Sequence, residues 1–197
     1  MSNTPLNENA LQQIFTEARS HHVFFEREIP DTLLQQLYDL TKWAPTSFNM
    51  CPARFVFVCS KPAKEKLATA LMEANIPQTM QAPVTVIVAT DSQFYEELPR
   101  LYPAYDAKPI YANNPAAAEE AGFRNGSLQG AYLMLAARSL GLDVGPMSGF
   151  DAAKLDTLFF PDGRYKSNFL VNLGYGDASK LHPRGPRLSF DEACRVV

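Results

Sequence analysis

The chain has 197 residues, 46% of them hydrophobic, and a formal net charge of −3 with charges of both signs scattered along it. This length fits one domain spanning 1–197, and the absence of a basic stripe argues against a nucleic-acid partner. No apolar run approaches the roughly 20 residues of a membrane span, and the polar start lacks the basic and apolar regions of a signal peptide. Three widely spaced cysteines are typical of reduced thiols, so we expect a cytoplasmic protein.

Apolar spacing and helix-end residues predict the elements in chain order. The predicted helices cover residues 8–18, 31–44, 62–73, 119–140, 151–159 and 190–196. The predicted strands cover residues 54–59, 84–89 and 168–173, and the apolar run at 84–89 is typical of a strand buried on both faces. Many helices around few strands predict an α+β protein with one sheet between helix layers.

Two of these helices carry clear end signals. Asp31 is a good N-cap for the second helix, and Ser189 with Glu192 forms a capping box for the last one. In the second helix, one face is predicted to be buried and consists of Leu33, Leu37, Leu40 and Ala44.

The segment from Trp43 to Asn49 changes from apolar to polar between a helix and a strand. Pro45 cannot continue the helix, because it lacks an N–H and its ring clashes with the preceding turn. Thr46, Ser47 and Asn49 then form a loop held at both ends, which can present donors to an anion or a heterocycle. An ordinary helix-ending turn would also explain these residues.

Residues 91–117 have a composition that resists regular structure. Tyrosines and prolines alternate there, at Tyr95, Pro99, Tyr102, Pro103, Tyr105, Pro109, Tyr111 and Pro115. We expect a long, partly ordered flap, which is either an active-site cover or a surface excursion.

The helix at 119–140 is apolar nearly all round. One face consists of Leu128, Ala131 and Leu135, and the overlapping face consists of Leu133, Ala136 and Leu140. Such a helix must be buried on most sides, so we expect a central helix shared with a second subunit.

Several familiar motifs are incomplete here. The segment 174–179 starts like GxGxxG but ends in Ser and is followed by prolines, which argues against a dinucleotide site. The segment 145–149 is no nucleophile elbow, because Ser148 comes one place late. No HxxxH or CxxC pattern supports zinc, and we interpret His21 and His22 as a surface or phosphate-proximal pair.

Five separated segments resemble the flavin-dependent nitroreductase family, in the family's order and over nearly the whole chain. They are Arg19-Ser20 with His22, the segment 43–47 with Asn49 and Pro52, Asn75 before the strand at 84, Gly141-Leu142 with 145–150, and 174–176 with Arg184 and Arg187. The resemblance implies a three-layer fold with a central, mostly antiparallel sheet flanked by helices. It also implies an intertwined homodimer that binds FMN at the dimer interface.

The resemblance further implies roles for individual residues. Residues expected at the FMN phosphate or the pyrimidine edge of the ring are Arg19, Ser20 and Arg184, with His22 and Gln78 where many relatives carry a basic residue. Residues expected to reach the flavin of the other subunit are Pro45, Thr46, Ser47 and Asn49. Residues expected along the ring are Asn75, Pro146, Met147, Ser148 and Gly149, with a backbone N–H towards flavin N5.

Residues 146–151, 166–168 and 174–181 more closely resemble the subgroup that contains the malonic semialdehyde reductase of the Rut uracil-degradation pathway. This implies ping-pong hydride transfer from NAD(P)H through FMN to malonic semialdehyde, giving 3-hydroxypropanoate without a protein nucleophile. Arg100 or Lys108 on the flap would orient the substrate carboxylate. The rival interpretations are a broad nitroaromatic or quinone reductase, a flavin-binding protein without turnover, and a structural dimer without cofactor.

Overall fold

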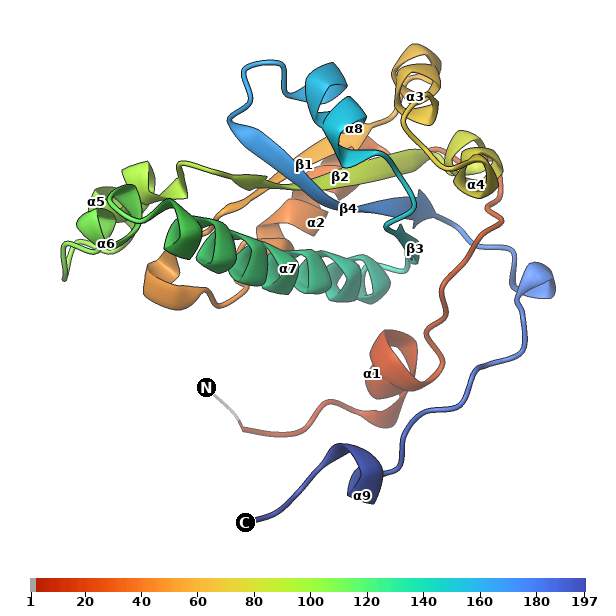
Figure 1. Cartoon of the computed structure of the whole chain (residues 1–197). Helices are drawn as coiled ribbons and strands as arrows, with labels where there is room; N and C mark the ends of the chain where they lie inside the picture. The colour runs from red at the N-terminus through yellow and green to blue at the C-terminus, as the bar shows by residue number, and fades with distance from the viewer. Residues whose placement is uncertain (1–2) are drawn as a thin grey trace.

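The computed structural model describes residues 3–197 and places an antiparallel sheet between two layers of helices (Figure 1). The strands are β1 (Ala53–Val58), β2 (Val84–Asp91), β3 (Asp143–Met147) and β4 (Tyr165–Gly174). Their order is β1-β2-β4-β3, so the two longest strands lie in the centre. This architecture confirms the predicted α+β class.

Two pairs of helices cover the sheet. On one face, α2 (Asp31–Thr41) and α7 (Pro115–Ser139) pack against the side chains of Val86, Val88 and Val171. On the other face, α3 (Lys61–Ala68) and α8 (Ala152–Phe159) enclose a second core, which contains Ile87, Ala89 and Leu170. Because successive side chains of a strand point to opposite faces, both faces of β2 are buried, as its continuous apolar run predicts.

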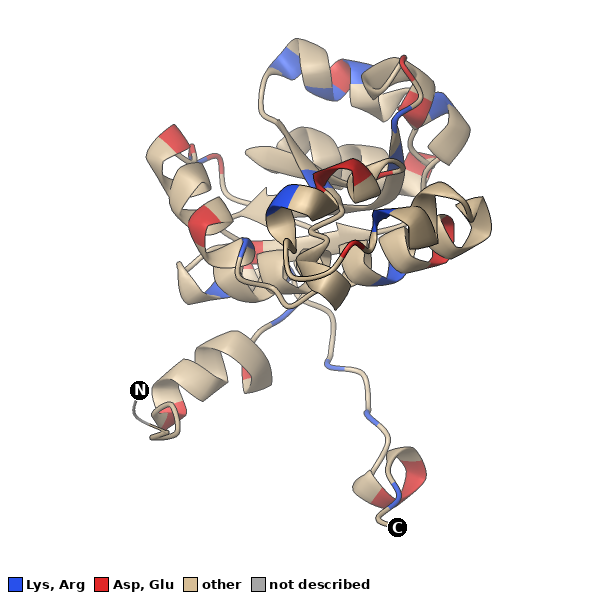
Figure 2. Cartoon of the chain, turned by 90° about the vertical axis from the view of Figure 1, so that its left-hand side faces the viewer, with Lys and Arg blue, Asp and Glu red and all other residues tan. Residues whose placement is uncertain are grey.

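The remaining helices are short. They are α1 (Glu8–Leu11), which continues as a π-helical turn at Gln12–Thr16, then Ser47–Asn49, Glu73–Asn75, α4 (Ile76–Gln81), Phe94–Glu97, α5 (Leu98–Leu101), α6 (Lys108–Ala112), Ala178–Lys180 and α9 (Phe190–Ala193). In both ribbon views the N-terminal and C-terminal segments leave the body of the molecule on the same side (Figures 1 and 2). The capping box of Ser189 and Glu192 is present at the start of α9. Within residues 3–197 no helix is both long and apolar enough to cross a bilayer.

Helix α2 ends earlier than the sequence predicts, and it buries most of the predicted face. Leu37 and Ala44 are buried and Leu33 packs against the same core, as predicted, whereas Leu40 is 45% exposed. Only Leu40 was wrongly predicted as a core residue, because the buried position at this end of the helix is Thr41, whose hydroxyl donates to Leu37 O.

Two segments are more ordered than the sequence predicts. The flap at 91–117 contains three short helices, because Phe94, Leu98 and Tyr111 pack with Met50 into a small third core. Strand β3 was missed, since Gly and Pro weaken a strand signal. Gly145 is needed in this strand, because a Cβ there would lie 2.3 Å from His21 O.

The long helix α7 begins earlier than predicted and is buried on one face within the protomer. Pro115 is tolerated in its first turn, and the Asn114 side chain caps it by accepting from Ala117 N. Leu133 and Ala136 are buried as predicted, but Leu128 is 46% exposed. One of the two predicted apolar faces therefore lies uncovered in the single chain.

Candidate functional site

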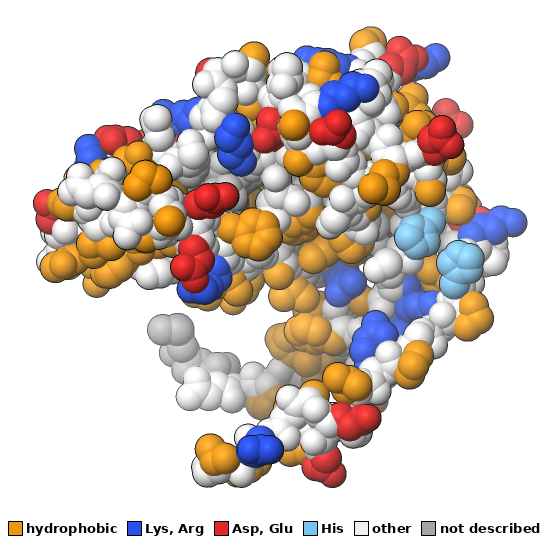
Figure 3. Space-filling view, viewed as in Figure 1, with side chains coloured by type: hydrophobic (Ala, Val, Ile, Leu, Met, Phe, Trp, Pro, Cys, Tyr) orange, Lys and Arg blue, Asp and Glu red, His pale blue; other side chains and the backbone are white. Residues whose placement is uncertain are grey.

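A cavity of about 220 Å³ opens where the N-terminal segment, the end of α7 and the C-terminal segment meet. We call it the basic cavity. The residues that line it are Ala18, Arg19, Ser20, His22, Arg138, His182, Arg184, Gly185 and Arg187. Figure 3 shows pale-blue histidines with several blue Lys or Arg side chains near them on this side of the molecule. The lining contains no Asp or Glu, so the cavity is a region of concentrated positive charge.

Backbone pairing holds the N-terminal part of this cavity in place. Ser20 forms a bridge with Val144 of β3, and His21 N donates to Val144 O at 2.9 Å. The His21 side chain is buried, with Nδ1 3.4 Å from Asp143 Oδ1, so the surface interpretation of this residue was wrong. Arg19, Ser20 and His22 are thereby fixed at the edge of the sheet.

The arginines of the basic cavity bind backbone carbonyl groups instead of carboxylates. Arg19 Nη2 donates to His182 O, Arg184 Nη2 donates to Ala18 O at 3.2 Å, and Arg187 Nη1 donates to Gly185 O at 3.0 Å. In the part of the chain that the structure describes, none of them takes part in an ion pair. Their charges are therefore available to an anion.

Arg138 adds a partly buried cation to the same cavity. Its Nη1 donates to Ile14 O at 3.2 Å, and its Nε is buried with no hydrogen-bond partner among residues 3–197. Burial lowers the pKa of the Arg138 guanidinium, and the charge of Asp143 offsets this only in part. A buried donor without a partner indicates that a further acceptor belongs here.

Next to the basic cavity lies a chain of hydrogen bonds that we call the polar ledge, formed by His22, Gln78, Asn75 and Gly149. His22 Nδ1 is 2.7 Å from Gln78 Oε1, Gln78 Nε2 donates to Asn75 Oδ1 at 2.7 Å, and Asn75 Nδ2 donates to Gly149 O at 2.9 Å. Four residues predicted for one ligand are thus connected across three distant segments. His22 belongs to both the ledge and the cavity, which makes the two contiguous.

The end of β3 runs into this ledge. Met147 is buried, with its sulfur 3.7 Å from Gln78 Nε2, whereas Pro146 is half-buried and Ser148 is exposed. A Cβ on Gly149 would lie 2.4 Å from Asn75 Nδ2, so this close approach requires glycine. The predicted segment 146–149 therefore borders the same surface as Asn75 and Gln78.

The turn after α2 lies elsewhere in the protomer. Phe48, Asn49 and Cys51 have φ values of 50°, 48° and 40°, a left-handed conformation that is strained for a bulky residue such as Phe. Ser47 N donates to Asn125 Oδ1 at 2.9 Å, which fixes the turn against the first half of α7. The Ser47 side chain is exposed beside Pro45.

The hydrogen bonds of Thr46 and Asn49 are partly local. Cys51 N donates to Thr46 Oγ1 at 3.2 Å, and Asn49 Nδ2 donates to Leu101 O at 3.0 Å. Asn125, which holds this turn, and Arg138, which lines the basic cavity, are both on α7. They are separated by about 20 Å at a rise of 1.5 Å per residue. One protomer therefore does not bring the two predicted groups together.

The two predicted substrate cations are on the flap, and each has a carboxylate partner. Arg100 Nη2 is 2.9 Å from Glu97 Oε2, and Lys108 Nζ is 2.6 Å from Glu96 Oε2. The hydrogen bond that Lys108 donates to Glu96 raises the pKa of Lys108. Both side chains are charged and accessible, and their role towards a substrate stays a prediction.

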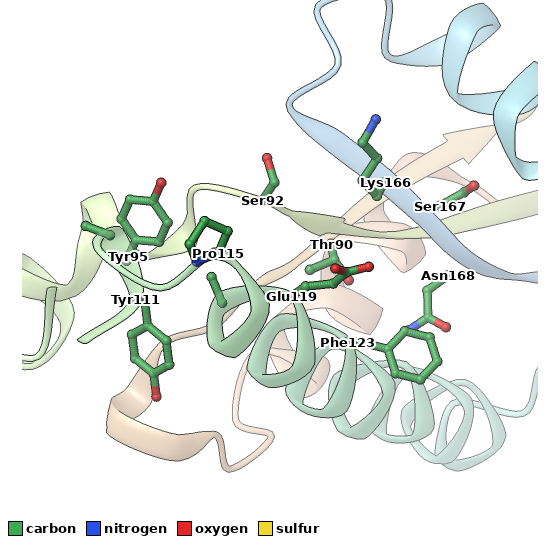
Figure 4. Close-up of a pocket in the computed structure, with 12 residues that line it drawn as sticks. Thr90, Ser92, Tyr95, Tyr111, Pro115, Glu119, Phe123, Lys166, Ser167 and Asn168 are labelled. Carbon is green, nitrogen blue, oxygen red and sulfur yellow. The ribbon is translucent and has the colours of Figure 1, made fainter. Parts of the chain in front are cut away.

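A second cavity, of about 500 Å³, lies between the first half of α7 and the adjacent ends of β2 and β4 (Figure 4). Lys166 and Glu119 line it together with Thr90, Phe123 and Asn168. One cation and one anion give this cavity no excess of charge. It therefore lacks the excess of positive charge that distinguishes the basic cavity.

Sequence reasoning did not select Arg138 and His182 as site residues. An arginine in the last turn of a helix is usually explained by the helix dipole, so Arg138 gave no separate signal. His182 lies in an irregular segment and enters the cavity only through folding. Within residues 3–197, no cluster of His, Cys, Asp or Glu is suited to hold a metal ion.

The fold and the site together define an α+β protein with a positively charged cavity beside a hydrogen-bonded polar surface. The profile of the nitroreductase family matches residues 16–175, and the chain belongs to this family. It is 60% identical over 192 residues to a protein of Stenotrophomonas maltophilia named "Putative NADH dehydrogenase/NAD(P)H nitroreductase", covering 98% of each chain.

Two solved structures have a similar fold. The "putative nitroreductase ydfN" of Bacillus subtilis superposes with a TM-score of 0.88 at 23% identity, covering 97% of this chain and all of that one. A "putative nitroreductase in complex with FMN" from Exiguobacterium sibiricum gives a TM-score of 0.86 at 20% identity, covering 100% of both chains. At these identities the likeness concerns the fold.

Proposed function

We propose that this protein binds FMN and transfers hydride from NAD(P)H to a small aldehyde, reducing malonic semialdehyde to 3-hydroxypropanoate. The observation that carries the flavin assignment is the group of arginines in the basic cavity that bind only neutral carbonyls. A phosphate dianion is the natural ligand for such guanidinium groups. The membership of the nitroreductase family and the FMN complex of the Exiguobacterium protein support the same cofactor.

Each part of the site has a role in this proposal. Arg19, Ser20 and Arg184 hold the phosphate, and Arg138 Nε, which has no hydrogen-bond partner among residues 3–197, donates to it as well. Asn75 and Gln78 contact the pyrimidine edge of the flavin and hold it in position, and a backbone N–H of residues 146–149 faces flavin N5. When bound, FMN supplies the hydride chemistry, so the protein's task is to position it and to exclude water.

The proposal requires a homodimer, because the turn at 45–49 is the second part of each flavin site. Exposed apolar side chains support this association. On α7, Phe123 is 60% exposed and Leu128 is 46% exposed; on the C-terminal segment, Leu188 is 69% and Phe190 is 63% exposed. Apolar surface of this kind favours contact with a second copy.

Mixing two defective variants tests the shared site. Arg184→Ala impairs the phosphate end, and Ser47→Phe fills the space in front of the exposed turn. In a heterodimer of the two, one site carries both changes and the other carries neither. Co-expressed variants should therefore bind FMN at about a quarter of the wild-type sites, by random pairing of subunits. If each site lies within one chain, mixing restores nothing.

The choice of acceptor is supported by the sequence resemblance in residues 146–151 and 174–181. Arg100 or Lys108, both accessible on the flap, would orient the substrate carboxylate. A tyrosine or a water molecule would donate the proton that the new hydroxyl group needs. The flap is close to the turn at 45–49, because Asn49 Nδ2 donates to Leu101 O.

One experiment tests the whole proposal. The purified protein should be yellow, and NADPH added without oxygen should bleach it. Malonic semialdehyde should then restore the flavin absorbance at a rate that matches turnover. A colourless protein would contradict the flavin assignment, and a yellow protein that NADPH fails to bleach would be a binding protein without turnover.

Nitroaromatic or quinone reduction is the second candidate. It is favoured by the names of the relatives and by aromatic side chains on the flap, where Tyr105 stacks on Phe48 of the turn at 45–49 with ring centroids 6.0 Å apart. Flat acceptors would suit such a surface. Turnover of malonic semialdehyde and of nitrofurazone at equal enzyme concentration separates the two candidates.

A further inference from the structure

The backbone of the turn after α2 is unusual for the residues that form it. Phe48 has φ 50° and ψ 26°, and Asn49 and Cys51 also have positive φ values. Glycine adopts such angles without strain, but none of these positions is glycine. A bulky residue stays in this conformation only where its surroundings hold it there, and such sites are concentrated near functional surfaces.

Hydrogen bonds fix the residues on either side of Phe48. Before it, Ser47 N donates to Asn125 Oδ1 of α7 at 2.9 Å. After it, Cys51 N donates to Thr46 Oγ1 at 3.2 Å, which closes the turn on itself. These bonds hold the ends of the turn, so the side chain of Phe48 is the remaining support for its own conformation.

The ring of Phe48 packs against tyrosines of the flap at 91–117. Its centroid is 5.5 Å from that of Tyr102 and 6.5 Å from that of Tyr111, both in edge-to-face geometry. It stacks on Tyr105 with an interplanar angle of 18°. These separations are those of attractive aromatic pairs. A negative φ at residue 48 would re-aim its Cα–Cβ bond and separate the ring from these tyrosines, so the packing stabilises the left-handed conformation.

The same conformation determines which side chains of the turn are presented to solvent. Ser47 and Asn49 are exposed, whereas Phe48 between them is half-buried against the flap. Asn49 Nδ2 also donates to Leu101 O, which joins the turn to the flap a second time. The ring of Phe48 thus anchors the segment whose exposed residues are expected to reach a flavin.

We propose that Phe48 is a positioning residue for the flavin bound at the partner subunit. Its ring, held by the flap tyrosines, keeps the turn at 45–49 in the conformation that binds FMN, and it acts through Ser47 and Asn49. This inference rests on the proposed flavin function and adds a residue to it. Because the supporting rings are on the flap, order in the flap of one chain strengthens FMN binding at the site shared with the other.

The dissociation constant of FMN tests this role. Dilution of the full-length holoprotein releases FMN, and the recovery of flavin fluorescence gives Kd; urea unfolding after removal of FMN gives the stability. Phe48→Ala loses the ring but keeps the preference for negative φ. Most molecules should then adopt another turn conformation, and Kd should rise roughly tenfold.

Two further substitutions at the same position separate the ring from the backbone angles. Phe48→Gly also lacks the ring, but glycine adopts a positive φ without strain, so its Kd should lie between those of the wild type and Phe48→Ala. This order reverses the usual advantage of alanine over glycine in a folded chain. Phe48→Tyr keeps an aromatic ring and should restore the wild-type Kd.

Variants elsewhere separate positioning from a general loss of stability. Tyr105 is 55% exposed, so Tyr105→Leu removes the stacking partner of Phe48 without opening the core, and it should also raise Kd. Phe160 is buried in the core on the opposite face of the sheet from α7. Phe160→Ala should therefore lower the urea midpoint and leave Kd unchanged.

The outcomes distinguish this inference from the function on which it rests. An unchanged Kd in Phe48→Ala or in Tyr105→Leu would overturn the inference and leave the flavin assignment intact. Weaker FMN binding in Phe48→Gly than in Phe48→Ala would overturn it as well, and so would an equal rise of Kd in Phe160→Ala. A wild-type protein that binds no FMN would remove the proposed function itself.

Discussion

Two groups of arginines in this protein have opposite surroundings. Arg54 and Arg164 both bind the fully buried carboxylate of Asp91: Arg54 Nη2 lies 2.8 Å from Oδ2, and Arg164 Nε lies 2.9 Å from Oδ1. Gln93 N donates to the same carboxylate at 2.9 Å. In the basic cavity, by contrast, Arg19 and Arg184 bind backbone carbonyls only.

The difference separates a structural role from a binding role. A buried carboxylate that holds two guanidinium groups fixes the ends of three strands, because Arg54 is on β1, Asp91 on β2 and Arg164 just before β4. Guanidinium groups without a counter-charge repel one another in the free protein and gain energy when an anion binds. The partner of an arginine therefore indicates its role better than its position in the sequence.

The substitution Asp91→Asn should give the largest effect. Removing the buried carboxylate leaves two cations without their counter-charge, so the free energy of unfolding should fall by about 3–5 kcal/mol. The affinity of the remaining folded protein for FMN should not change. Urea unfolding at matched protein concentration and FMN titration measure the two quantities.

A surface carboxylate is the matched control for this change. Asp39 is partly exposed and its partner Lys42 is 2.7 Å away, so Asp39→Asn should leave the urea midpoint unchanged. A similar loss of stability in both variants would contradict a special role for Asp91.

Acid should remove the contribution of Asp91 gradually. Burial alone would raise the pKa of Asp91, but hydrogen bonds from Arg164 and Gln93, together with the charge of Arg54, hold it below the ordinary value of 3.8. The stabilisation is complete above that value and is lost as the pH falls through the lower pKa of the folded state.

The difference in unfolding free energy between wild type and Asp91→Asn measures this loss. We expect it to stay constant from pH 7 to about pH 5, and to shrink below the ordinary carboxyl pKa. A difference that already shrinks between pH 7 and pH 5 would mean that the carboxyl is protonated too early, and would contradict the lowered pKa.

The substitution Arg184→Ala should weaken FMN binding and leave the stability of the free protein unchanged, the reverse of what we expect for Asp91→Asn. A hydrogen bond to a charged group is worth about 1.5–3 kcal/mol, so the affinity for FMN should fall roughly 10-fold to 100-fold. The free protein should unfold at the same urea concentration or a higher one, because one repelling charge is gone.

An arginine outside the cavity controls for the loss of positive charge. Arg124 is exposed on α7 and paired with Glu120, so Arg124→Ala should leave the FMN affinity unchanged. Equal losses of affinity in the two variants would indicate a general electrostatic effect and not a phosphate contact.

The fold was largely predictable because its signals are local. The apolar run at 84–89 and the capping box at Ser189 each lie within a few residues, and both are present in the structure. The order of the strands and the short strand β3 depend on pairing between distant residues, such as Val144 with Leu173. No local pattern encodes such a pairing.

The candidate site was predictable only by resemblance to a family. The segments holding His22, Asn75 and Gly149 are far apart in the sequence, and each residue alone is ordinary. The hydrogen bonds between them arise from folding, as does the entry of Arg138 into the basic cavity. The wrong assignment of His21 has the same origin, because its burial depends on Gly176, where a Cβ would lie 2.2 Å from the His21 ring.

Arg100 and Lys108 lie between the two groups of arginines in character, because each is accessible to a ligand and also has a carboxylate partner. Replacing either of them should change activity less than the substitutions above change stability or FMN affinity. To orient a substrate carboxylate, the cation would exchange its ion pair with Glu for one with the substrate, so the net gain in binding free energy is small. We expect Arg100→Ala to raise KM for malonic semialdehyde roughly threefold to tenfold with kcat unchanged.

Nitrofurazone provides the internal control for this variant, since it has no carboxylate. Its KM should not change in Arg100→Ala, and Lys108→Ala shows which of the two cations faces the substrate. An equal rise of KM for both acceptors would mean that the ion pair with Glu97 only holds the flap in shape. A paired surface arginine would then belong with Arg54 and Arg164, as a structural residue, despite its exposure to solvent.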